Sequence, residues 1–382
     1  MVQPPKEKKA YMLYGVITTM LVLFSLIFVA LCMEFLLRKG LVDNSLYQIS
    51  VFRKNINTVL EETGAPQKLL IVGDSFFCPS CEVDQTLKDW FEGYRVSVLN
   101  VAFSGYSPVD YYLNVKKFGR LFQPDVVLMG YYTGNDLTDL KYRLGKDSPL
   151  ESANRLVPFH TSLEKGKYFF GQYLWEWLLT HVNSRKMKKK WINEWRQGPV
   201  DENIIDLYEN GALINPHRVN VGIVDPEHIR SNLLIHTPGD EATWQKIDRI
   251  IRDIHGMCQE MKAQFVIVVF PNTAQVNDQH HSLYQGMNLK MDPAFLTEKG
   301  GPQQRIVGLC DELEIDCLNM LPAYRARGQE HLYFETDDHM NHEGAQLAAS
   351  LIFDFLQDTT ALTTGSIVES EQMTPQQHGP TQ

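Results

Sequence analysis

The apolar residues of this chain fall into short runs separated by polar segments and by stretches with helical periodicity. Five runs have the length and composition of buried strands: 67–73, 95–101, 124–131, 264–270 and 314–319. Before the fourth run, apolar residues recur at helical spacing, at Trp244, Ile247, Ile250, Ile251, Ile254 and Met261. Strands that alternate with amphipathic helices predict a parallel sheet with right-handed crossovers and helices on both faces.

The N-terminal region has a different pattern, with one long apolar run. Tyr11 to Met33 are 23 consecutive uncharged, mostly apolar residues, enough for a helix to cross a bilayer core of about 30 Å. The run ends in Ala30-Leu31-Cys32-Met33-Glu34, a poor cleavage site for a signal peptide. Cys32 is also a weak lipid-attachment candidate, because Leu31 stands where a small residue is expected. We therefore expect a retained transmembrane anchor.

Charges on either side of this run give a small bias in orientation. Three lysines and the α-amino group precede it, and Arg38 and Lys39 follow it. The positive-inside rule then favours a cytoplasmic N-terminus. The remainder of the chain would lie outside the cytoplasm, in the periplasm if the cell is Gram-negative.

These patterns divide the chain into segments. We expect a cytoplasmic tail at 1–10, an anchor at 11–37, a stem with some helical character at 38–66, an α/β domain at 67–357 with an insertion at about 141–240, and a disordered tail at 358–382. The insertion is rich in aromatic residues and then in lysine and arginine. It is consistent with a packed subdomain that has one solvated basic helix, with a substrate-binding cap, or with a surface that contacts anionic lipid or polymer.

Composition narrows the class of protein. The 382 residues include 44% hydrophobic residues, which can fill the core of one large α/β domain. The net charge of −10 argues against a general nucleic-acid-binding protein, which would be basic. The expected fold class is thus a three-layer, flavodoxin-like parallel sheet with helices on both faces, preceded by one transmembrane helix.

The most informative motif is Gly73-Asp74-Ser75, directly after the apolar run Lys68 to Val72. A strand that ends in a glycine turn at the carboxyl edge of a parallel sheet can present a serine as a nucleophile. The alternative interpretation is that Ser75 only caps the following helix.

Three further blocks occur in order along the chain. They are Asn100-Val101-Ala102-Phe103-Ser104-Gly105, Gly130-Tyr131-Tyr132-Thr133-Gly134-Asn135-Asp136 and Asp337-Asp338-His339-Met340-Asn341-His342-Glu343-Gly344. With the Ser75 turn, this ordered set resembles the SGNH (GDSL-type) hydrolase family. The resemblance covers Lys68 to about Leu356, apart from the long middle stretch.

A serine hydroxyl needs a base to remove its proton. His339 is the candidate base, and Asp337 could accept a hydrogen bond from its other ring nitrogen. Many members of the family space this pair as Asp-x-x-His, which would place Thr336 at the acid position. A membrane-anchored subgroup carries Asp-x-His-x-Asn-x-x-Gly instead, and the segment from Asp337 to Gly344 resembles that version. Asp338 remains a lesser candidate for the acid.

The resemblance also implies an oxyanion hole, which would stabilise the tetrahedral intermediate. Its donors would be the backbone N–H groups of Ser75 and Gly105 and the side-chain amide of Asn135. Asp74 is expected to organise the loop rather than to catalyse. No cofactor is expected, and the histidines show no convincing spacing for a metal site.

Cys78-Pro79-Ser80-Cys81 is the main competing motif. A Cys-x-x-Cys at a helix start is typical of thioredoxin-like redox sites. In an oxidising compartment, the same pair can form a local disulfide beside the nucleophile loop. Cys258, Cys310 and Cys317 could be buried and free, or Cys310 could pair with Cys317.

The sequence thus predicts a membrane-anchored serine esterase that acts on an acylated small molecule, lipid or glycan. The nearest alternative is an O-acyltransferase acting on a polysaccharide or envelope glycan, because the same serine can pass its acyl group to a hydroxyl. Relatives with the late Asp-x-His block include proteins that modify polysaccharide O-acetylation. A redox protein using the cysteine pair, or a non-catalytic binding module on the same scaffold, would be a different class. The acyl group, the alcohol and the oligomeric state are not specified by the sequence.

Overall fold

The structure is a computed structural model of the 382-residue chain. It describes residues 5–38, 45–61, 67–78, 81–144, 189, 192–193, 196–198, 202–209, 231–232, 240–286, 301–327, 331–334 and 338–362. The chain divides into two compact units, Met1–Lys54 with His160–Lys190 and Asn55–Phe159 with Trp191–Gln382. Each unit is considered by itself.

The first unit contains the long N-terminal helix α1 (Pro5–Arg38) and the start of α2 (Ser45–Glu61). Within α1, the 21 residues Val16–Leu36 have a mean hydropathy of 2.7, and none of that stretch is buried against protein. One helix is therefore long and apolar enough to cross a membrane, although a signal sequence would share both properties. The helix α2 lies within the segment expected to be a stem with helical character.

The second unit is built on one five-stranded sheet, in which all described pairings are parallel. Its strands are β1 (Gln67–Val72), β2 (Val96–Asn100), β3 (Val126–Tyr132), β4 (Gln264–Phe270) and β5 (Asp316–Asn319). Each strand lies within two residues of the predicted run. The order β2-β1-β3-β4-β5 confirms the predicted doubly wound, flavodoxin-like fold.

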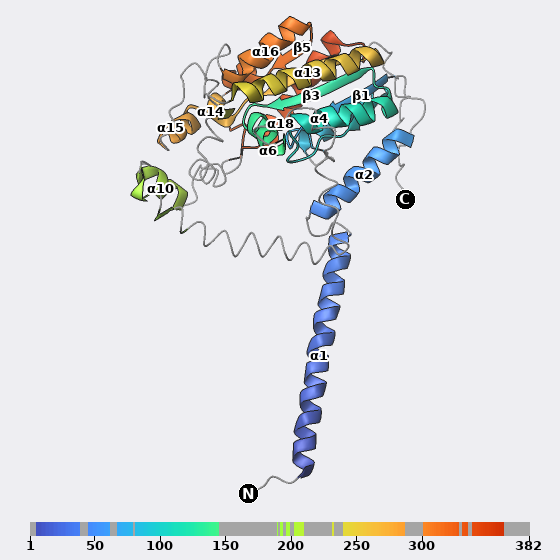
Figure 1. The fold of residues 1–382 in the computed structure, drawn as a ribbon, viewed down its shortest axis with the longest axis vertical. Helices are drawn as coiled ribbons and strands as arrows, with labels where there is room; N and C mark the ends of the chain where they lie inside the picture. Colours follow the sequence, from blue (N-terminus) through green and yellow to red (C-terminus); the bar gives the residue numbers. More distant parts are fainter. Residues whose placement is uncertain are drawn as a thin grey trace, which may run out of the picture. The chain divides into compact units, whose positions relative to one another are not determined.

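Helices cover both faces of this sheet (Figure 1). One core joins Leu69 and Ile71 of β1 to the helices α3 (Glu82–Glu92) and α18 (His342–Thr359). The opposite face is covered by α4 (Pro108–Asn114), α13 (Glu241–Met261) and α16 (Gly301–Leu313). The predicted amphipathic helix is α13, where Trp244 and four isoleucines are fully buried.

Shorter elements complete the described part of the domain. They are the π-helix η1 (Val115–Gly119), α5 (Arg120–Phe122), α6 (Asp136–Leu144), α10 (Glu202–Glu209), α14 (Thr273–Val276), α15 (Asp278–Gly286) and α17 (Leu321–Ala326). Of the expected insertion at 141–240, most residues, including most of its basic segment, lie outside the described residues. The predicted tail begins at 358, close to the end of α18 at Thr359, and residues 363–382 lie outside the description.

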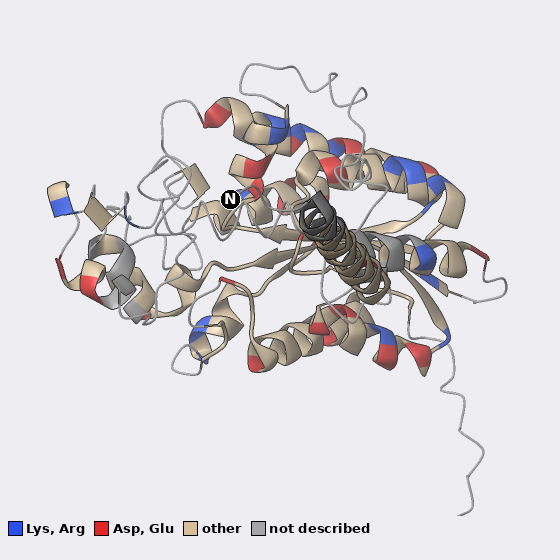
Figure 2. Cartoon of the chain, turned by 90° about the horizontal axis from the view of Figure 1, so that it is seen from below, with Lys and Arg blue, Asp and Glu red and all other residues tan. Residues whose placement is uncertain are grey.

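Charged side chains lie on the outer helices, and both signs are interspersed (Figure 2). On α13 and α16, for example, Arg305 pairs with Glu241 at 2.8 Å and with Asp248 at 3.3 Å. Such partly exposed pairs each contribute little to stability, on the order of 1 kcal/mol or less. The sheet between the helix layers is apolar, so burial of its residues is the main source of stability.

The strand order also predicts where a ligand binds. In an open parallel sheet, ligands bind beyond the carboxyl ends of the strands, at the point where the strand order reverses. Here the reversal falls between β1 and β3. Ser75 follows β1 and Asn135 follows β3, so the two residues lie on either side of that point.

Candidate active site

The turn after β1 presents Ser75 at the carboxyl edge of the sheet. The Asp74 carboxyl accepts a hydrogen bond from the Phe76 N–H at 3.0 Å, and the Phe77 N–H donates to the Asp74 carbonyl at 3.3 Å. A side chain at Gly73 would crowd Phe77 at 3.1 Å. These contacts make the turn tight and agree with the expected loop-organising role of Asp74. Ser75 itself is half-buried and so remains accessible from one side.

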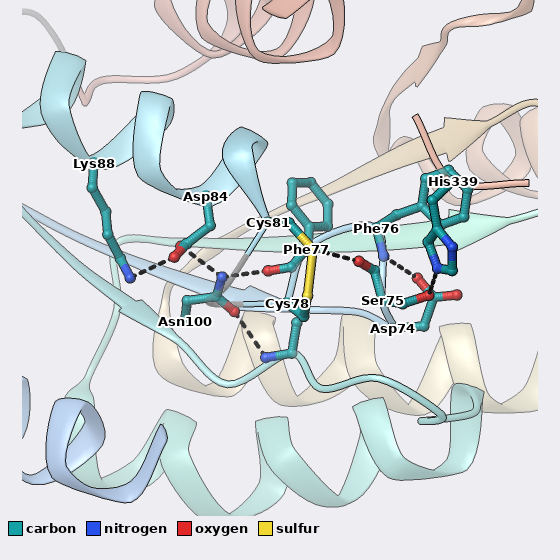
Figure 3. Close-up of a disulfide and its surroundings, with 11 residues drawn as sticks. Asp74, Ser75, Phe76, Phe77, Cys78, Cys81, Asp84, Lys88, Asn100 and His339 are labelled. Atoms are coloured by element: carbon teal, nitrogen blue, oxygen red, sulfur yellow. Dashed lines mark hydrogen bonds and ion pairs between the residues drawn. A yellow bond between two sulfur atoms is a disulfide. The ribbon is translucent and has the colours of Figure 1, made fainter. Parts of the chain in front are cut away.

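His339 lies in hydrogen-bond contact with Ser75, although 264 residues separate them in the sequence. The His339 Nε2 to Ser75 Oγ distance is 2.8 Å (Figure 3). The ring of Phe76 stacks on the His339 ring with a centroid distance of 5.5 Å, and on its other neighbour, Tyr132, at 4.0 Å. The residue after the serine therefore helps to fix the plane of the imidazole.

The segment around His339 is held by backbone pairing and a helix cap. Tyr333 and Met340 form an antiparallel bridge, and the Phe334 N–H donates to the His339 carbonyl at 3.0 Å. The Asn341 side chain caps α18 by accepting from the Gly344 N–H at 3.0 Å. A side chain at Gly344 would collide with the Leu332 carbonyl. The Asn and Gly of the late motif thus have structural roles in presenting the histidine.

The acid of the predicted triad, Asp337, lies outside the described residues. The lesser candidate, Asp338, is described and buried. Burial lowers the pKa of His280 on α15, and the nearby Asp338 carboxylate acts in the opposite direction. Asp338 therefore lies within electrostatic reach of a second histidine. The choice between the two aspartates stays a prediction.

Asp74 combines burial with proximity to the site. Burial raises the pKa of its carboxyl to about 6, against hydrogen bonding from Phe76, the positive charge available on His339 and the nearby amide of Asn135, which all lower it. A carboxyl group with this pKa can be ionised at neutral pH.

Gly105, the second predicted oxyanion donor, lies on the loop after β2. This loop continues along the nucleophile turn, because the Phe103 N–H donates to the Gly73 carbonyl at 3.3 Å. Gly105 has φ 80°, a left-handed conformation that favours glycine, and it is exposed. The structure therefore places Gly105 on a loop that pairs with the loop carrying Ser75.

Asn135, the third predicted donor, precedes the first residue of α6 and is half-buried. Its backbone carbonyl accepts hydrogen bonds from the Asp139 N–H at 2.8 Å and the Thr138 hydroxyl at 2.9 Å. Its side-chain amide is near enough to Asp74 to lower the pKa of that carboxyl. Asn135 thus adjoins the nucleophile turn and has its backbone fixed by the start of a helix.

A disulfide joins Cys78 and Cys81 just beyond the nucleophile turn, with a Cα–Cα distance of 5.3 Å (Figure 3). The sulfur of Cys81 lies 2.7 Å from the Ser75 carbonyl oxygen. For the later cysteines, the sequence allowed either free thiols or a Cys310–Cys317 pair. In the structure both Cys310 and Cys317 are free thiols. A hydrogen bond with Cys317, together with burial, raises the pKa of the Cys310 thiol.

Asn100, at the end of β2, connects the two loops beneath the disulfide. Its amide donates to the Phe77 carbonyl at 2.6 Å and to Asp84 at 2.7 Å, and its oxygen accepts from the Ala102 N–H at 2.8 Å. Asp84 is paired in turn with Lys88 at 2.7 Å. No role for Asn100 could be predicted from the sequence, because its partners come from three separate segments. Its position within the second block was the only available signal.

Among the described residues, no three His, Cys, Asp or Glu side chains come together as a possible metal site. The polar groups near Ser75 are instead one imidazole, that of His339, and two loops that carry the predicted hydrogen-bond donors. A serine hydroxyl in hydrogen-bond contact with an imidazole, at the switch point of a parallel sheet, is the arrangement of enzymes with an activated serine nucleophile.

Comparison with known families supports a specific assignment within that class. Residues 230–381 match the family model described as "SGNH hydrolase-like domain, acetyltransferase AlgX". The C-terminal part of the chain therefore matches an SGNH hydrolase-like domain, which confirms the resemblance found in the sequence. The matched segment includes His339, whereas Ser75, Gly105 and Asn135 precede it. No curated protein shows significant similarity to the chain.

Solved structures with a related arrangement are distant. A Bacillus subtilis protein is 10% identical, with 76% of this chain and 56% of that chain covered and a TM-score of 0.37. A lipase/acylhydrolase from Enterococcus faecalis is 10% identical, with 76% of this chain and 96% of that chain covered and a TM-score of 0.38. An acetylxylan esterase from Geobacillus stearothermophilus is 10% identical, with 78% of this chain and 97% of that chain covered and a TM-score of 0.39. These identities and TM-scores are too low to support an argument about this chain. Its fold is defined by the topology of its own sheet.

Proposed function

We propose that the protein is a membrane-anchored serine esterase that cleaves an acyl ester through Ser75. The observation that carries the proposal is the 2.8 Å contact between Ser75 Oγ and His339 Nε2. A general base must lie within hydrogen-bond reach of the proton that it removes, and this contact meets that requirement. Ser75 and His339 are half-buried, so both side chains keep some exposed surface.

The reaction would proceed in two stages. His339 takes the hydroxyl proton while Ser75 Oγ attacks the ester carbonyl carbon, and the carbonyl oxygen becomes an oxyanion. The N–H groups of Ser75 and Gly105 and the amide of Asn135 would stabilise that charge. Collapse of the intermediate breaks the ester C–O bond, and the departing alcohol takes the proton from His339. A water molecule, deprotonated by His339, then releases the acid and restores the Ser75 hydroxyl.

Acyl transfer to a hydroxyl group is the second candidate. The match to a family described by an acetyltransferase favours it, since that match includes the segment with His339. The first stage is unchanged, and a sugar hydroxyl replaces water in the second. The substrate would be an O-acylated glycan, lipid or small molecule in either case.

The helix α1 supports membrane attachment. Its stretch Val16–Leu36 has the length and hydropathy of a single span, and the basic residues before it favour a cytoplasmic N-terminus. The catalytic domain would then act outside the cytoplasm. A reporter enzyme that is active only in that compartment, fused after Gln382, should be active. A well-expressed but inactive fusion would reverse the orientation.

The deciding experiment uses the full chain in detergent with a fluorophosphonate probe, and separately with an aryl acetate as acyl donor and an oligosaccharide as acceptor. We expect the probe to label the Ser75 peptide, and labelling should be lost in Ser75→Ala but retained in Ser104→Ala. Equal release of phenol and acetate indicates hydrolysis. Less acetate than phenol, with an acetylated oligosaccharide detected by mass spectrometry, indicates transfer. Absence of labelling and turnover in wild-type protein would reject the serine mechanism.

A further inference from the structure

The two loops that carry the proposed oxyanion donors each lead directly into a helix. Gly105 lies two residues before Ser107, the N-cap of α4. Asn135 lies one residue before the start of α6. The distance between the two donors therefore depends on how α4 and α6 are held together. Two side-chain links join these helices, and both involve buried aspartates.

The first link joins Tyr111 of α4 to Asp136 of α6. The Tyr111 hydroxyl donates to Asp136 Oδ1 at 2.7 Å, while the Tyr132 N–H donates to Asp136 Oδ2 at 2.8 Å. Both Tyr111 and Asp136 have no exposed surface. The Asp136 carboxyl thus closes the turn that contains Asn135 and at the same time ties that turn to α4.

The second link joins Asp110 of α4 to Arg143 of α6. Arg143 contacts both carboxyl oxygens of Asp110, through Nη2 at 3.1 Å and through Nε at 3.3 and 3.4 Å. The same carboxyl accepts from the Ser107 hydroxyl at 3.0 Å and the Ser107 N–H at 3.2 Å. Asp110 therefore connects the N-cap next to Gly105 with the helix that begins after Asn135.

We infer that Tyr111, Asp136, Asp110 and Arg143 form a clamp that sets the distance between the Gly105 and Asn135 donors. This inference rests on the proposed serine mechanism, in which both donors bind the oxyanion. The four residues are positioning residues, because they act through the two loops and do not contact the reacting atoms. The links start from adjacent residues of α4 and reach opposite ends of α6, so together they restrict both the distance and the relative orientation of the two helices.

The physical argument is one of geometry in the transition state. Oxyanion donors are effective only when they converge on the position of the developing charge, and removing one donor costs about 10²- to 10³-fold in kcat. A displaced donor should have a smaller effect of the same kind. Ground-state binding of the ester should change little, because the charge is not yet present.

The test compares Tyr111→Phe with wild-type protein, using the full chain in detergent. This variant removes one hydroxyl and keeps the ring that fills the core. The matched control is Tyr94→Phe, which removes a hydroxyl bonded to Gln357 at 3.0 Å, away from the clamp. Three quantities are measured: kcat and KM for an aryl acetate, inhibition by a small alkylboronic acid, and Tm. The boronic acid forms a tetrahedral adduct with the serine and so reports on the oxyanion hole.

We expect Tyr111→Phe to lower kcat by about 10- to 100-fold with KM within about threefold. Boronic acid inhibition should weaken by a similar factor, whereas Tyr94→Phe should leave both quantities unchanged. Arg143→Gln provides a second, partly exposed test if the first variant unfolds. Arg143→Lys should restore part of the loss, because lysine keeps the charge but not the two-pronged contact.

Each other outcome overturns the inference. Unchanged kcat and boronic acid inhibition in folded Tyr111→Phe and Arg143→Gln would show that the links do not position the donors. A rise in KM alone would assign the residues to substrate binding. Wild-type protein that neither turns over the acetate nor reacts with the fluorophosphonate would reject the proposed function, and the oxyanion role with it. The activity of the wild-type protein therefore distinguishes a failure of the clamp inference from a failure of the proposed serine mechanism.

Discussion

Ser75 and His339 are half-buried, and the helices that follow them, α3 and α18, are joined by a partly exposed contact, whereas the Gly105 and Asn135 loops are supported by polar groups with no exposed surface. On the first side, α3 and α18 are joined by Glu82, which contacts His342 at 2.5 Å and Gln346 at 2.8 Å. The His342 side chain is 69% exposed. On the second side, Asp110 and Asp136 have no exposed surface.

This difference determines what a mutation can report. Changing an accessible reacting group alters the chemistry with little effect on the fold, so a loss of activity can be assigned directly. Changing a buried support affects both folding and geometry, because an unpaired buried polar group is costly. Asp74 belongs to both sides, since His339 and Asn135 both act to lower the pKa of its carboxyl. The predictions below begin on the accessible side.

The largest effects should come from the reacting pair. Ser75→Ala and His339→Ala should each lower kcat for an aryl acetate by roughly 10⁴- to 10⁶-fold, with Tm nearly unchanged. The double variant should be little worse than either single variant, because the two side chains act as one unit. Steady-state kinetics and thermal denaturation measure both quantities.

His255→Ala, on α13, is the control for removing a histidine elsewhere. Additive losses in the double variant would contradict a shared proton transfer. Retention of most of the activity in Ser75→Ala would assign the hydrolysis to another group.

The next largest effect concerns the acid partner of His339. Asp337→Asn should lower kcat by about 10²- to 10⁴-fold. An asparagine would neither hold the neutral imidazole in the required tautomer nor stabilise the imidazolium that forms when His339 takes the proton. Asp338→Asn should cost clearly less. The measurement is kcat as a function of pH for both variants, and equal Tm values show that both are equally folded. The reverse order would transfer the acid's role to Asp338.

Much of the site could be predicted because its reacting residues follow strands. Parallel strands bring their carboxyl ends to one edge, so Ser75 and Asn135 could be assigned to the same region from local patterns alone. The late block placed His339 there as well, although nothing in its spacing explains the contact with Ser75. The five strands were recognisable because each lies in a short run rich in apolar residues.

The supports could not be predicted, because their partners are determined by packing. Tyr111 and Asp136 are 25 residues apart, and Asp110 and Arg143 are 33 residues apart. No local pattern shows that a tyrosine and an aspartate on separate helices will share a hydrogen bond. The role of Asn341 as a helix cap follows a known local rule, but the collision that requires Gly344 depends on the Leu332 carbonyl, twelve residues earlier.

Asp74 provides a smaller test that links the two sides of the site. Its folded-state pKa of about 6 lies above the ordinary value of 3.8, so its contribution to stability is complete below about pH 4 and is lost as the pH rises through about 6. The full difference corresponds to about 3 kcal/mol. Asp74→Asn does not titrate. Its Tm relative to wild type should therefore increase between about pH 4 and about pH 7.

Thermal denaturation of both proteins across this pH range measures the difference. Asp89→Asn, at an exposed position of α3, controls for the removal of one negative charge. A constant difference in Tm between Asp74→Asn and wild type at every pH would show that Asp74 is not held in a burial-raised state.

The smallest effect should come from the disulfide, which separates the esterase from a redox protein. Replacing Cys78 and Cys81 with serine removes a cross-link that closes a very short loop, with an expected loss of roughly 2 kcal/mol in the chain-entropy model. Ester turnover should largely persist, because Asp74 and Asn100 hold the nucleophile turn independently of the sulfur atoms. A redox catalyst would instead reduce a disulfide substrate in a Cys78-dependent way. Strong Cys78-dependent reduction, together with full activity of Ser75→Ala in the same assay, would make the cysteine pair the functional centre and the serine turn its scaffold.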